Sequence, residues 1–503
     1  MNETNQNTSK ENPKQKLASV KLEWIFGIRN DILPNLYVID ADTMIYPASN
    51  YIVIYHTRKM PYNQVQHFIQ GTPHSKGFVA LNILNTLHKK IVATAEEVSE
   101  GVNINIYSLI SSGGHTNLPV KMHSPSLYDI RTVKVYHLAF SQRDQPNNNY
   151  FAVVGMNDEP SLILWKFDFD VLKDRLVFVL KLPHLNFKRM QIAFSVFKNE
   201  NFCIVSDKFF IHYVIANKSI QPLFTFHLDS ESSNYGTKIY SHCWFFDGNF
   251  GICTDISILV FDPYMKLIQQ ISSVQETPEA SSCITCIWPM IDGFVAVGRN
   301  KRFEVYEKKF DMYEIIAEKK VFETNVSSAD KYDKVSSADK LAENSEKEKS
   351  FDFLSLGGIN NSTEPFVIAT TSQNDIVQIN INTLDLDSQP FKHLLSPFHY
   401  DSIEGIDICI SKPYIISCSL DKTLKIWDYK KKSLVFNKSF DEEMYSVAYH
   451  PNGMHAVVGF PDKILPLHVF YDEIGNMANP ITLKSNSKSK DVNHYLIYKI
   501  NYF

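Results

Sequence analysis

The 503-residue sequence has no strong charge imbalance and no long hydrophobic run. Its 50 basic and 55 acidic side chains give a formal net charge of −5, so it lacks the basic excess that indicates nucleic-acid binding. No apolar run is long enough to span a bilayer, and the polar start, MNETNQNTSKENPKQK, lacks the apolar segment of a secretory signal. We therefore expect no nucleic acid and no membrane among the partners of this protein.

Cysteine is also scarce, with seven residues spread through apparent strands. Cys283 and Cys286 have the spacing of a metal-binding pair, but a structural zinc ion needs about four ligands and no second pair stands nearby. Buried, reduced thiols are the better interpretation of these residues. We expect no metal and no cofactor.

Short apolar or alternating runs recur along the chain between turn residues, and they predict strands. The clearest run of each unit ends on an aromatic or apolar residue, and most of these closing residues are about 43 to 58 residues apart, close to the length of a WD-type blade. The nine closing residues are Tyr55, Tyr107, Trp165, Tyr213, Phe261, Tyr306, Ile379, Trp427 and Phe470.

The longest separation, between Tyr306 and Ile379, contains VSSADK twice, at 326–331 and 335–340. This stretch has almost no large apolar side chain, so it cannot bury enough surface to offset the entropy of ordering. We predict a disordered insert at about 323–350.

The segment SCSLDKTLKIWD, at 417–428, has the signature of one WD-repeat blade. His399, Ser417, Asp421 and Trp427 stand where such blades form a buried hydrogen-bonded chain, in which the indole needs a partner. A His-Ser-Asp hydrolase is the alternative, but a nucleophile also needs an oxyanion hole and access for substrate. We predict a structural blade network.

The predicted fold is all-β: a WD-repeat β-propeller with one complete seven-bladed wheel and the first blades of an incomplete second, since single wheels have about eight blades at most. The expected parts are a disordered tail at 1–20, the first propeller at 21–395, two blades of the second at 396–475, and an irregular tail at 476–503. Three explanations of the incomplete wheel stay open: a truncated product, an unusual single wheel of nine blades, or a partner that supplies the rest.

The basic turn YKKKS, at 429–433, follows the WD signature directly. Its side chains Lys430, Lys431 and Lys432 are a candidate contact for an acidic partner, although a short charged run in a loop is more often only solvated. Phosphate loops, dinucleotide fingerprints, zinc-protease motifs and nucleophile elbows are absent from the sequence. We therefore expect a protein that is not an enzyme. A propeller enzyme with its site in the central channel is the least favoured class.

Several phrases resemble the N-terminal part of the cilia- and flagella-associated protein fifty-seven family. They are WIFGIRNDILPNLYVIDADTMIYPASNYIVIY (24–55), FIQGTPHSKGFVALNI (68–83), KPYIISCSLDKTLKIWDY (412–429) and EEMYSVAYHPNGMHAVVGFPDKI (442–464). The resemblance covers about residues 22–470 and is most specific in the last two units.

The resemblance implies a non-enzymatic scaffold of the motile cilium axoneme, in the cytoskeleton of the cytoplasm. Its implied partners are inner dynein arms, regulatory complexes and doublet microtubules, with another WD-repeat chain as one way to complete the second propeller. Family members combine tandem propellers with a coiled-coil tail, and the sequence shows no such tail after Phe470. The alternative function is a general cytoplasmic WD-repeat adaptor in a ubiquitin-ligase, trafficking or signalling complex.

Overall fold

The computed structural model consists of strands and connecting loops, and the parts of the chain that it describes contain no helix, hence none that could cross a membrane. These strands form nine sheets, which we number sheets 1 to 9 in chain order. The described residues are 21–57, 65–86, 89–99, 101–111, 117–123, 134–143, 149–156, 159–168, 173–182, 189–216, 219–228, 234–272, 283–320, 351–359, 366–381, 391–395, 397–470 and 474–482.

The strands of sheets 1 to 3 are β1 (Tyr37–Asp40), β2 (Thr43–Ala48), β3 (Tyr51–His56), β4 (Val65–Gln70), β5 (Gly77–Asn85), β6 (Lys90–Val98), β7 (Gly101–Ser111), β8 (Asn117–His123), β9 (Lys134–Phe140), β10 (Tyr150–Met156), β11 (Pro160–Asp168) and β12 (Lys173–Lys181). Those of sheets 4 to 6 are β13 (Met190–Phe194), β14 (Asn201–Ser206), β15 (Phe209–Ala216), β16 (Ser219–His227), β17 (Ile239–Trp244), β18 (Phe250–Thr254), β19 (Ser257–Phe261), β20 (Leu267–Ser272), β21 (Ile284–Met290), β22 (Gly293–Gly298), β23 (Arg302–Lys309) and β24 (Met312–Lys320).

The strands of sheets 7 to 9 are β25 (Phe353–Ile359), β26 (Phe366–Thr371), β27 (Ile376–Asn380), β28 (Phe391–Leu395), β29 (Ile403–Ile408), β30 (Tyr414–Ser419), β31 (Thr423–Asp428), β32 (Ser433–Ser439), β33 (Ser446–Tyr449), β34 (His455–Gly459), β35 (Lys463–Val469), β36 (Ile474–Asn476) and β37 (Ile481–Thr482). Each sheet pairs its four consecutive strands in chain order, and β37 adds a fifth strand to sheet 9 by pairing with β35. Four-stranded sheets in series are the architecture of a propeller. The predicted all-β fold is confirmed.

Six of the nine predicted closing residues coincide with an irregularity in strand pairing. Where the third and fourth strands pair, a β-bulge or other irregularity begins immediately before the closing residue in six sheets. A bulge bends its strand and increases the local twist, so it marks a common position in these six sheets. The six closing residues are Tyr107, Trp165, Tyr213, Phe261, Tyr306 and Trp427.

The closing residue predicted for the ninth unit is wrong. Phe470 follows β35 and is 48% exposed, whereas Leu467 within β35 is fully buried in the core between sheets 8 and 9. Leu467 pairs with Ala456 across the hairpin, much as Trp427 pairs with Ile415 in sheet 8. The sequence pattern misled because the aromatic residue at 470 stands out more than the leucine.

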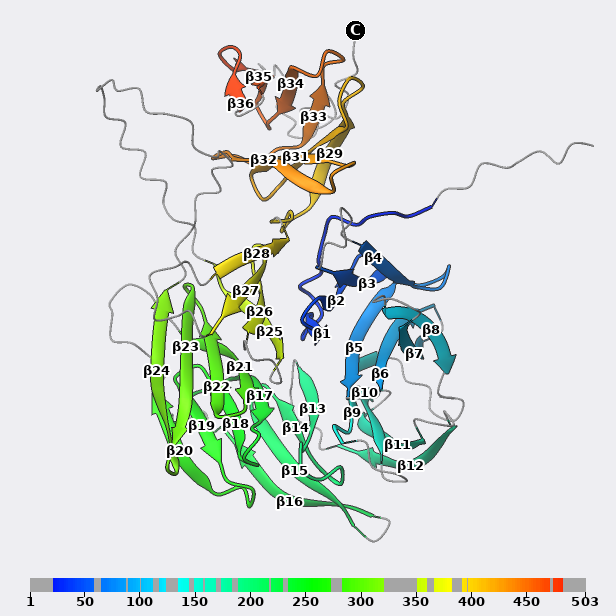
Figure 1. The fold of residues 1–503 in the computed structure, drawn as a ribbon, viewed down its shortest axis with the longest axis vertical. Helices are drawn as coiled ribbons and strands as arrows, with labels where there is room; N and C mark the ends of the chain where they lie inside the picture. Colours follow the sequence, from blue (N-terminus) through cyan, green and yellow to red (C-terminus); the bar gives the residue numbers. More distant parts are fainter. Residues whose placement is uncertain are drawn as a thin grey trace, which may run out of the picture.

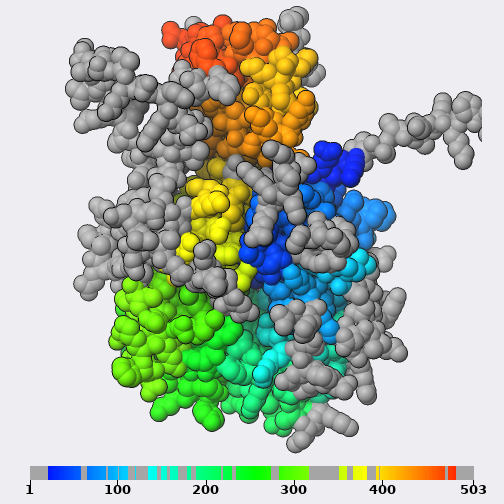
Figure 2. Space-filling view, viewed as in Figure 1, coloured from blue at the N-terminus to red at the C-terminus, as the bar shows by residue number. Residues whose placement is uncertain are grey.

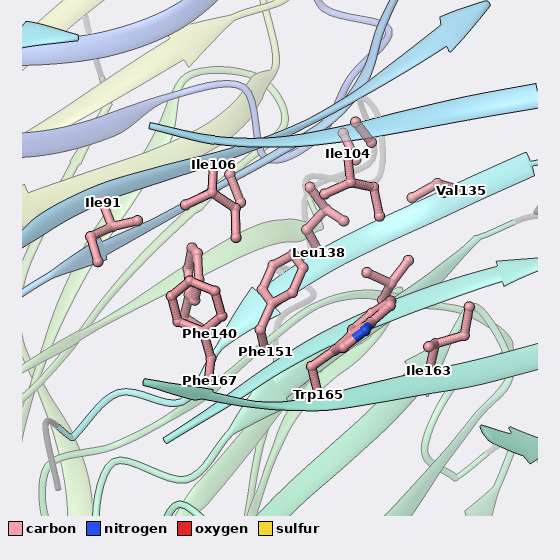
Figure 3. Packing of buried hydrophobic residues seen from close by; sticks show 14 of the residues in the cluster. Ile91, Ile104, Ile106, Val135, Leu138, Phe140, Phe151, Ile163, Trp165 and Phe167 are labelled. Carbon is pink, nitrogen blue, oxygen red and sulfur yellow. The ribbon is translucent and has the colours of Figure 1, made fainter. Parts of the chain in front are cut away.

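Sheets 1 to 7 follow one another around a ring, with β1 beside β25 (Figure 1). Seven hydrophobic clusters fill the spaces between neighbouring sheets, including the space between sheets 7 and 1. Figure 3 shows one of them, in which Ile104 and Ile106 of sheet 2 meet Phe151 and Trp165 of sheet 3. Each sheet of this ring is therefore covered on both faces.

Polar contacts also tie the chain before β1 to sheet 7. The Thr370 hydroxyl donates to Asn35 Oδ1 at 2.8 Å, and Asn30 Nδ2 donates to the Thr371 carbonyl at 3.2 Å. Thr370 and Asn35 are fully buried, so these hydrogen bonds satisfy polar groups inside the junction. The two ends of the ring are thereby joined.

Sheets 8 and 9 form a separate pair, which we call the two-sheet unit. They share one hydrophobic cluster, and β29 packs against β33. The space-filling view shows this unit, orange to red, rising from the ring beside the blue N-terminal segment and the yellow sheet 7 (Figure 2).

The division of the chain into a first propeller at 21–395 and two blades of a second at 396–475 stays a prediction. The tail at 1–20 and the insert at about 323–350 lie outside the described residues. Within the tail predicted from 476, the pairing of Ile481–Thr482 with β35 shows that sheet 9 continues past residue 475.

Candidate functional site

The four predicted network residues meet inside sheet 8. The Trp427 indole donates to Ser417 Oγ at 2.9 Å, Ser417 Oγ lies 2.8 Å from His399 Nε2, and His399 Nδ1 lies 2.9 Å from Asp421 Oδ2. Ser417 and Trp427 come from β30 and β31, Asp421 from the turn between them, and His399 from the chain that enters the sheet. Hydrogen bonds therefore join three segments of one blade.

The hydrogen bonds of this network all point in one direction, from Trp427 to Asp421. An indole nitrogen can only donate, so Ser417 Oγ accepts from Trp427 and gives its own proton to His399 Nε2. His399 Nδ1 then carries the second ring proton and donates it to Asp421. Every polar atom of this four-residue network has a hydrogen-bond partner when the His399 imidazole is neutral and the Asp421 carboxylate is charged.

The pKa directions agree with this assignment. Burial lowers the pKa of His399 below its ordinary value, and the hydrogen bond to Asp421 only partly opposes that effect. Burial raises the pKa of Asp421, but hydrogen bonds from His399 and Thr423 outweigh it, so the net pKa is lowered. A neutral histidine beside an ionised aspartate is the favoured state.

Thr423 is a member of the network that sequence reasoning missed. Its hydroxyl donates to Asp421 Oδ1 at 2.6 Å, and its backbone nitrogen donates to the same oxygen at 2.7 Å. Asp421 N donates to Ser419 Oγ at 3.1 Å, which fixes the turn from the other side. The signal was present in the spacing S-x-D-x-T at 419–423, a pattern in which short polar side chains hold a turn.

Access to Ser417 is closed by the packing around it. The residue is 1% exposed, and its oxygen is engaged by both Trp427 and His399. A serine nucleophile needs room for a substrate beside its oxygen, and the packing around Ser417 leaves none. The arrangement can stiffen the blade, and we find no route by which it could attack a substrate.

The outer face of Trp427 packs on aromatic side chains that sequence reasoning did not connect with it. Its ring centroid lies 4.9 Å from Phe26 and 6.3 Å from Phe398. Lys432 Nζ stands 5.2 Å from the ring centre of Trp24 in the same N-terminal segment. Trp427 thus closes its own blade and joins the two-sheet unit to the ring.

The basic turn between β31 and β32 is held by Asp428. Its Oδ1 accepts from Lys430 N at 3.0 Å and from Lys431 N at 2.8 Å, and both lysine residues are exposed. Lys432 is only partly exposed, because it lies over Trp24. Lys430 and Lys431 therefore point charge toward solvent on a fixed turn, and a partner contact at this turn stays a prediction.

The CITC pair lies in different surroundings from a metal site. Cys286 Sγ donates to the Leu354 carbonyl at 3.1 Å, and burial raises the pKa of this thiol to about 11. Burial also raises the pKa of Cys283. Protonated thiols are poor metal ligands. Within the described ranges no group of three or more metal-ligating side chains occurs, and the seven cysteines are free.

The two-sheet unit leaves several large apolar side chains exposed. Ile406 and Ile408 on β29 are 67% and 58% exposed, and Ile410, just after this strand, is 83% exposed. In sheet 9 and the turns beside its strands, four further large side chains are about half exposed. These four are Met454, Phe470, Met477 and Ile481. Ile406 and Ile408 share one face of β29, and exposed apolar side chains on one face mark an interaction surface or an aggregation hazard.

Comparisons with known proteins agree with the blade geometry. The family model described as WD domain, G-beta repeat, matches residues 392–428, which are the end of sheet 7 and most of sheet 8. The WD-repeat type of the all-β propeller is therefore confirmed. The number of blades in each wheel stays a prediction.

Three curated relatives share the name cilia- and flagella-associated protein 57. The Mus musculus protein is 25% identical over 490 residues, which is 90% of this chain. Tetrahymena thermophila has form A, 25% identical over 500 residues and 90% of this chain, and form C, 23% identical over 497 residues and 88%. The chain spans 36% of the length of each of these relatives. The resemblance expected from the sequence is confirmed: the chain carries a WD-type repeat and is similar to cilia- and flagella-associated protein 57 over about nine tenths of its length.

Proposed function

We propose that this chain is a cilium-associated, non-enzymatic WD-repeat scaffold. The observation that carries the proposal is the similarity, over about nine tenths of the chain, to three proteins named for association with cilia and flagella. A rigid ring of sheets is suited to this work, because it holds turns and loops in fixed positions for partners. The exposed isoleucines on β29 in the two-sheet unit also fit a protein that functions inside an assembly.

The finer part of the proposal is a place in the motile axoneme. There the chain helps to assemble or regulate inner dynein arms on doublet microtubules, as the family resemblance implies. Lys430 and Lys431 support a contact with acidic surfaces, since both are exposed on a turn fixed by Asp428.

The test is fractionation of cilia from cells that express the tagged chain. Membrane and matrix proteins are removed with detergent, and the axonemal pellet is probed for the tag. Retention in the pellet, and its loss after substitution of Lys430 and Lys431 by Glu, is the expected result. A matched control replaces the exposed Lys198 and Lys208 by Glu, which makes the same change of charge elsewhere on the ring.

The fractionation also separates the alternative function. A tagged chain found in the cell body, with no axonemal pool and with cytoplasmic partners on purification, is expected of a general WD-repeat adaptor. The WD-type blade alone fits both functions, and a segment of 90 residues is 29% identical to a protein named Striatin homolog from Dictyostelium discoideum. An adaptor result would overturn the ciliary proposal and leave the fold untouched.

We also propose that the two-sheet unit is the beginning of a second propeller, completed by further WD-type sheets. Ile406 and Ile408 stand on the strand that would face a preceding blade, and they are exposed where the corresponding face of sheet 9 is covered. A photo-crosslinker at Ile408, with Leu223 as an equally exposed control, tests this in isolated cilia. Crosslinked peptides from a WD-type strand are expected, and crosslinks to helical or disordered segments would contradict the proposal.

A further inference from the structure

One edge of sheets 5 and 6 carries an unusual row of apolar side chains. In an antiparallel sheet the first and third turns lie at the same edge. Each of these four turns presents one large exposed apolar residue: Phe246 at 41%, Tyr264 at 91%, Ile291 at 60% and Phe310 at 99% exposed. The turns at the opposite edge, at 255–256 and 299–301, carry no exposed large apolar side chain. We call the four residues the turn platform.

A cavity of about 280 Å³ opens at this platform. Phe246, Met290, Ile291 and Phe310 are the apolar members of its lining that reach solvent. The cavity is smaller than the sites that hold drug-sized ligands, and it is the right size for one or two side chains of a peptide. The platform therefore offers a socket with an apolar rim.

Polar bonds between the two sheets hold the platform rigid. Asp247, in the first turn of sheet 5, accepts from Lys308 Nζ at 2.7 Å and from the Tyr313 hydroxyl at 2.5 Å, both in sheet 6. Gln269 pairs with the backbone of Tyr313 in both directions, at 2.8 and 2.9 Å. A preformed socket loses little conformational freedom when a partner binds, which favours affinity.

Phe310 is held outward by a strained backbone. It is the first residue of a two-residue hairpin turn between β23 and β24, and its φ is 57°. Glycine or asparagine normally takes such a position, because a bulky side chain is disfavoured at positive φ. Strain of this kind, at a residue that touches almost nothing of its own chain, points to a use outside the fold.

The charges around the socket have an acidic excess. Lys308 is compensated by Asp247, and Lys309 by Glu314 at 3.3 Å. Asp292 and Glu307 also line the cavity, and neither has an ion-pair partner in the described part of the chain. The rim therefore attracts positive charge, while the socket attracts an apolar group.

We infer that the turn platform docks a basic protein segment, in which one large apolar side chain fills the socket and flanking Lys or Arg side chains face Asp292 and Glu307. Buried aromatic or aliphatic anchors supply most of the affinity at such interfaces, and rim charges supply orientation and rate. The inference goes beyond the ciliary proposal and does not depend on it, because it concerns a surface and a binding chemistry that are testable on the purified chain.

The test uses the full chain and fluorescein-labelled decapeptides, with binding followed by fluorescence anisotropy. One peptide has a central tryptophan between two pairs of lysines; the others replace the lysines by glutamates or the tryptophan by serine. Saturable binding of the first peptide is expected, at least about tenfold tighter than either of the others. Absence of saturable binding, or equal binding of the glutamate peptide, would overturn the inference.

Phe310→Gly separates docking from folding. Glycine suits the positive φ, so thermal stability is expected to stay the same or rise, while peptide affinity falls at least about tenfold. Leu223→Gly, on the exposed face of β16 in sheet 4, is the matched control and is expected to leave affinity unchanged. A Phe310→Gly chain that binds the lysine peptide as the parent does would contradict the assignment.

The double variant Asp292→Lys and Glu307→Lys tests the charge step. It is expected to lower the affinity for the lysine peptide about tenfold and to raise the affinity for the glutamate peptide. Sedimentation velocity examines the competing occupant, which is a second copy of the chain. Self-association that is abolished by Phe310→Gly, without peptide binding, would assign the platform to a contact between copies and overturn the peptide inference.

Discussion

The inner strands β33 and β29 show what a neighbouring sheet does for a propeller blade. In β33 the alternate residues Val447 and Tyr449 are buried in the hydrophobic cluster that sheet 9 shares with sheet 8. In β29 the alternate residues Ile406 and Ile408 are more than half exposed, although isoleucine is at least as apolar as the buried Val447 of β33. The apolar residues of a blade therefore need a neighbouring sheet on each face. Every sheet of the ring has two such neighbours, whereas each sheet of the two-sheet unit has one.

The same contrast appears at the level of the whole structure. Seven clusters for seven sheets make the ring continuous, so the loss of one contact is shared by neighbours on either side. The two-sheet unit has one cluster between its sheets and a small aromatic junction with the ring. Local unfolding should therefore begin in the two-sheet unit.

The largest expected effect is Trp427→Ala. The change removes the packing on Phe26 and Phe398 and leaves Ser417 without its indole donor, at a cost of about 3–5 kcal/mol to the unfolding free energy of the two-sheet unit. Calorimetry and hydrogen exchange should show residues 403–482 melting early with the ring intact. Trp165→Ala, buried between sheets 2 and 3, is the control and should lower the transition of the ring instead. A single unchanged transition in both variants would contradict the separation of the two regions.

The network position of Asp421 comes next. Asp421→Ala removes the acceptor for His399, Thr423 and the Tyr400 backbone nitrogen, and leaves buried donors without partners. We expect about 3 kcal/mol of destabilisation, since hydrogen bonds to a charged group are among the stronger ones. Chemical denaturation of the purified chain measures it. Asp401→Ala, an exposed aspartate of the same sheet, should change stability by less than about 0.5 kcal/mol.

Part of this network could be predicted from sequence, because Ser417, Asp421 and Trp427 stand on one hairpin and their relative positions follow from strand pairing. The contact of Trp427 with Phe26 could not, since the two residues belong to opposite ends of the chain and meet only when the ring closes. The turn platform escaped notice for a related reason. Phe246 and Phe310 look like ordinary strand residues until the turns that carry them are placed at one edge.

Acid should weaken the ring through its buried histidines. Burial lowers the pKa of His137 to about 3 and of His242 to about 4, with smaller contributions from nearby positive charge. Below about pH 6.5 the unfolded chain binds protons at these histidines that the folded ring does not bind. The free energy of unfolding therefore decreases as the pH is lowered from about 6.5 to the pKa values of the folded state. At pH 5.5 we expect a loss of about 1 kcal/mol for each of the two histidines.

Thermal unfolding at pH 7.5 and 5.5 checks this expectation. The double variant His137→Gln and His242→Gln should lose the part of the pH dependence that these two side chains supply, while His212, whose pKa burial lowers to about 4, keeps another part. His227→Gln, at an exposed position on β16, should not. A ring transition that is independent of pH in the parent chain would show that these side chains are hydrated in the folded state.

The smallest expected effect returns to the two inner strands. Ile408→Thr on β29 should change the unfolding free energy by less than about 0.5 kcal/mol, because its side chain gains little from the fold. Val447→Thr on β33 places a hydroxyl where sheet 8 covers it and should cost about 1–2 kcal/mol. The pair is matched, since both change one β-branched residue for threonine on corresponding strands.

If Ile408→Thr lowered the unfolding free energy as much as Val447→Thr, the exposed face of β29 would have to be covered in solution. The free chain would then associate with another copy through that face. Equal solubility of the two variants would support the same conclusion. If instead the Ile408→Thr chain aggregated less than the Val447→Thr chain, the aggregation-prone surface would be the face of β29 that has no neighbouring sheet.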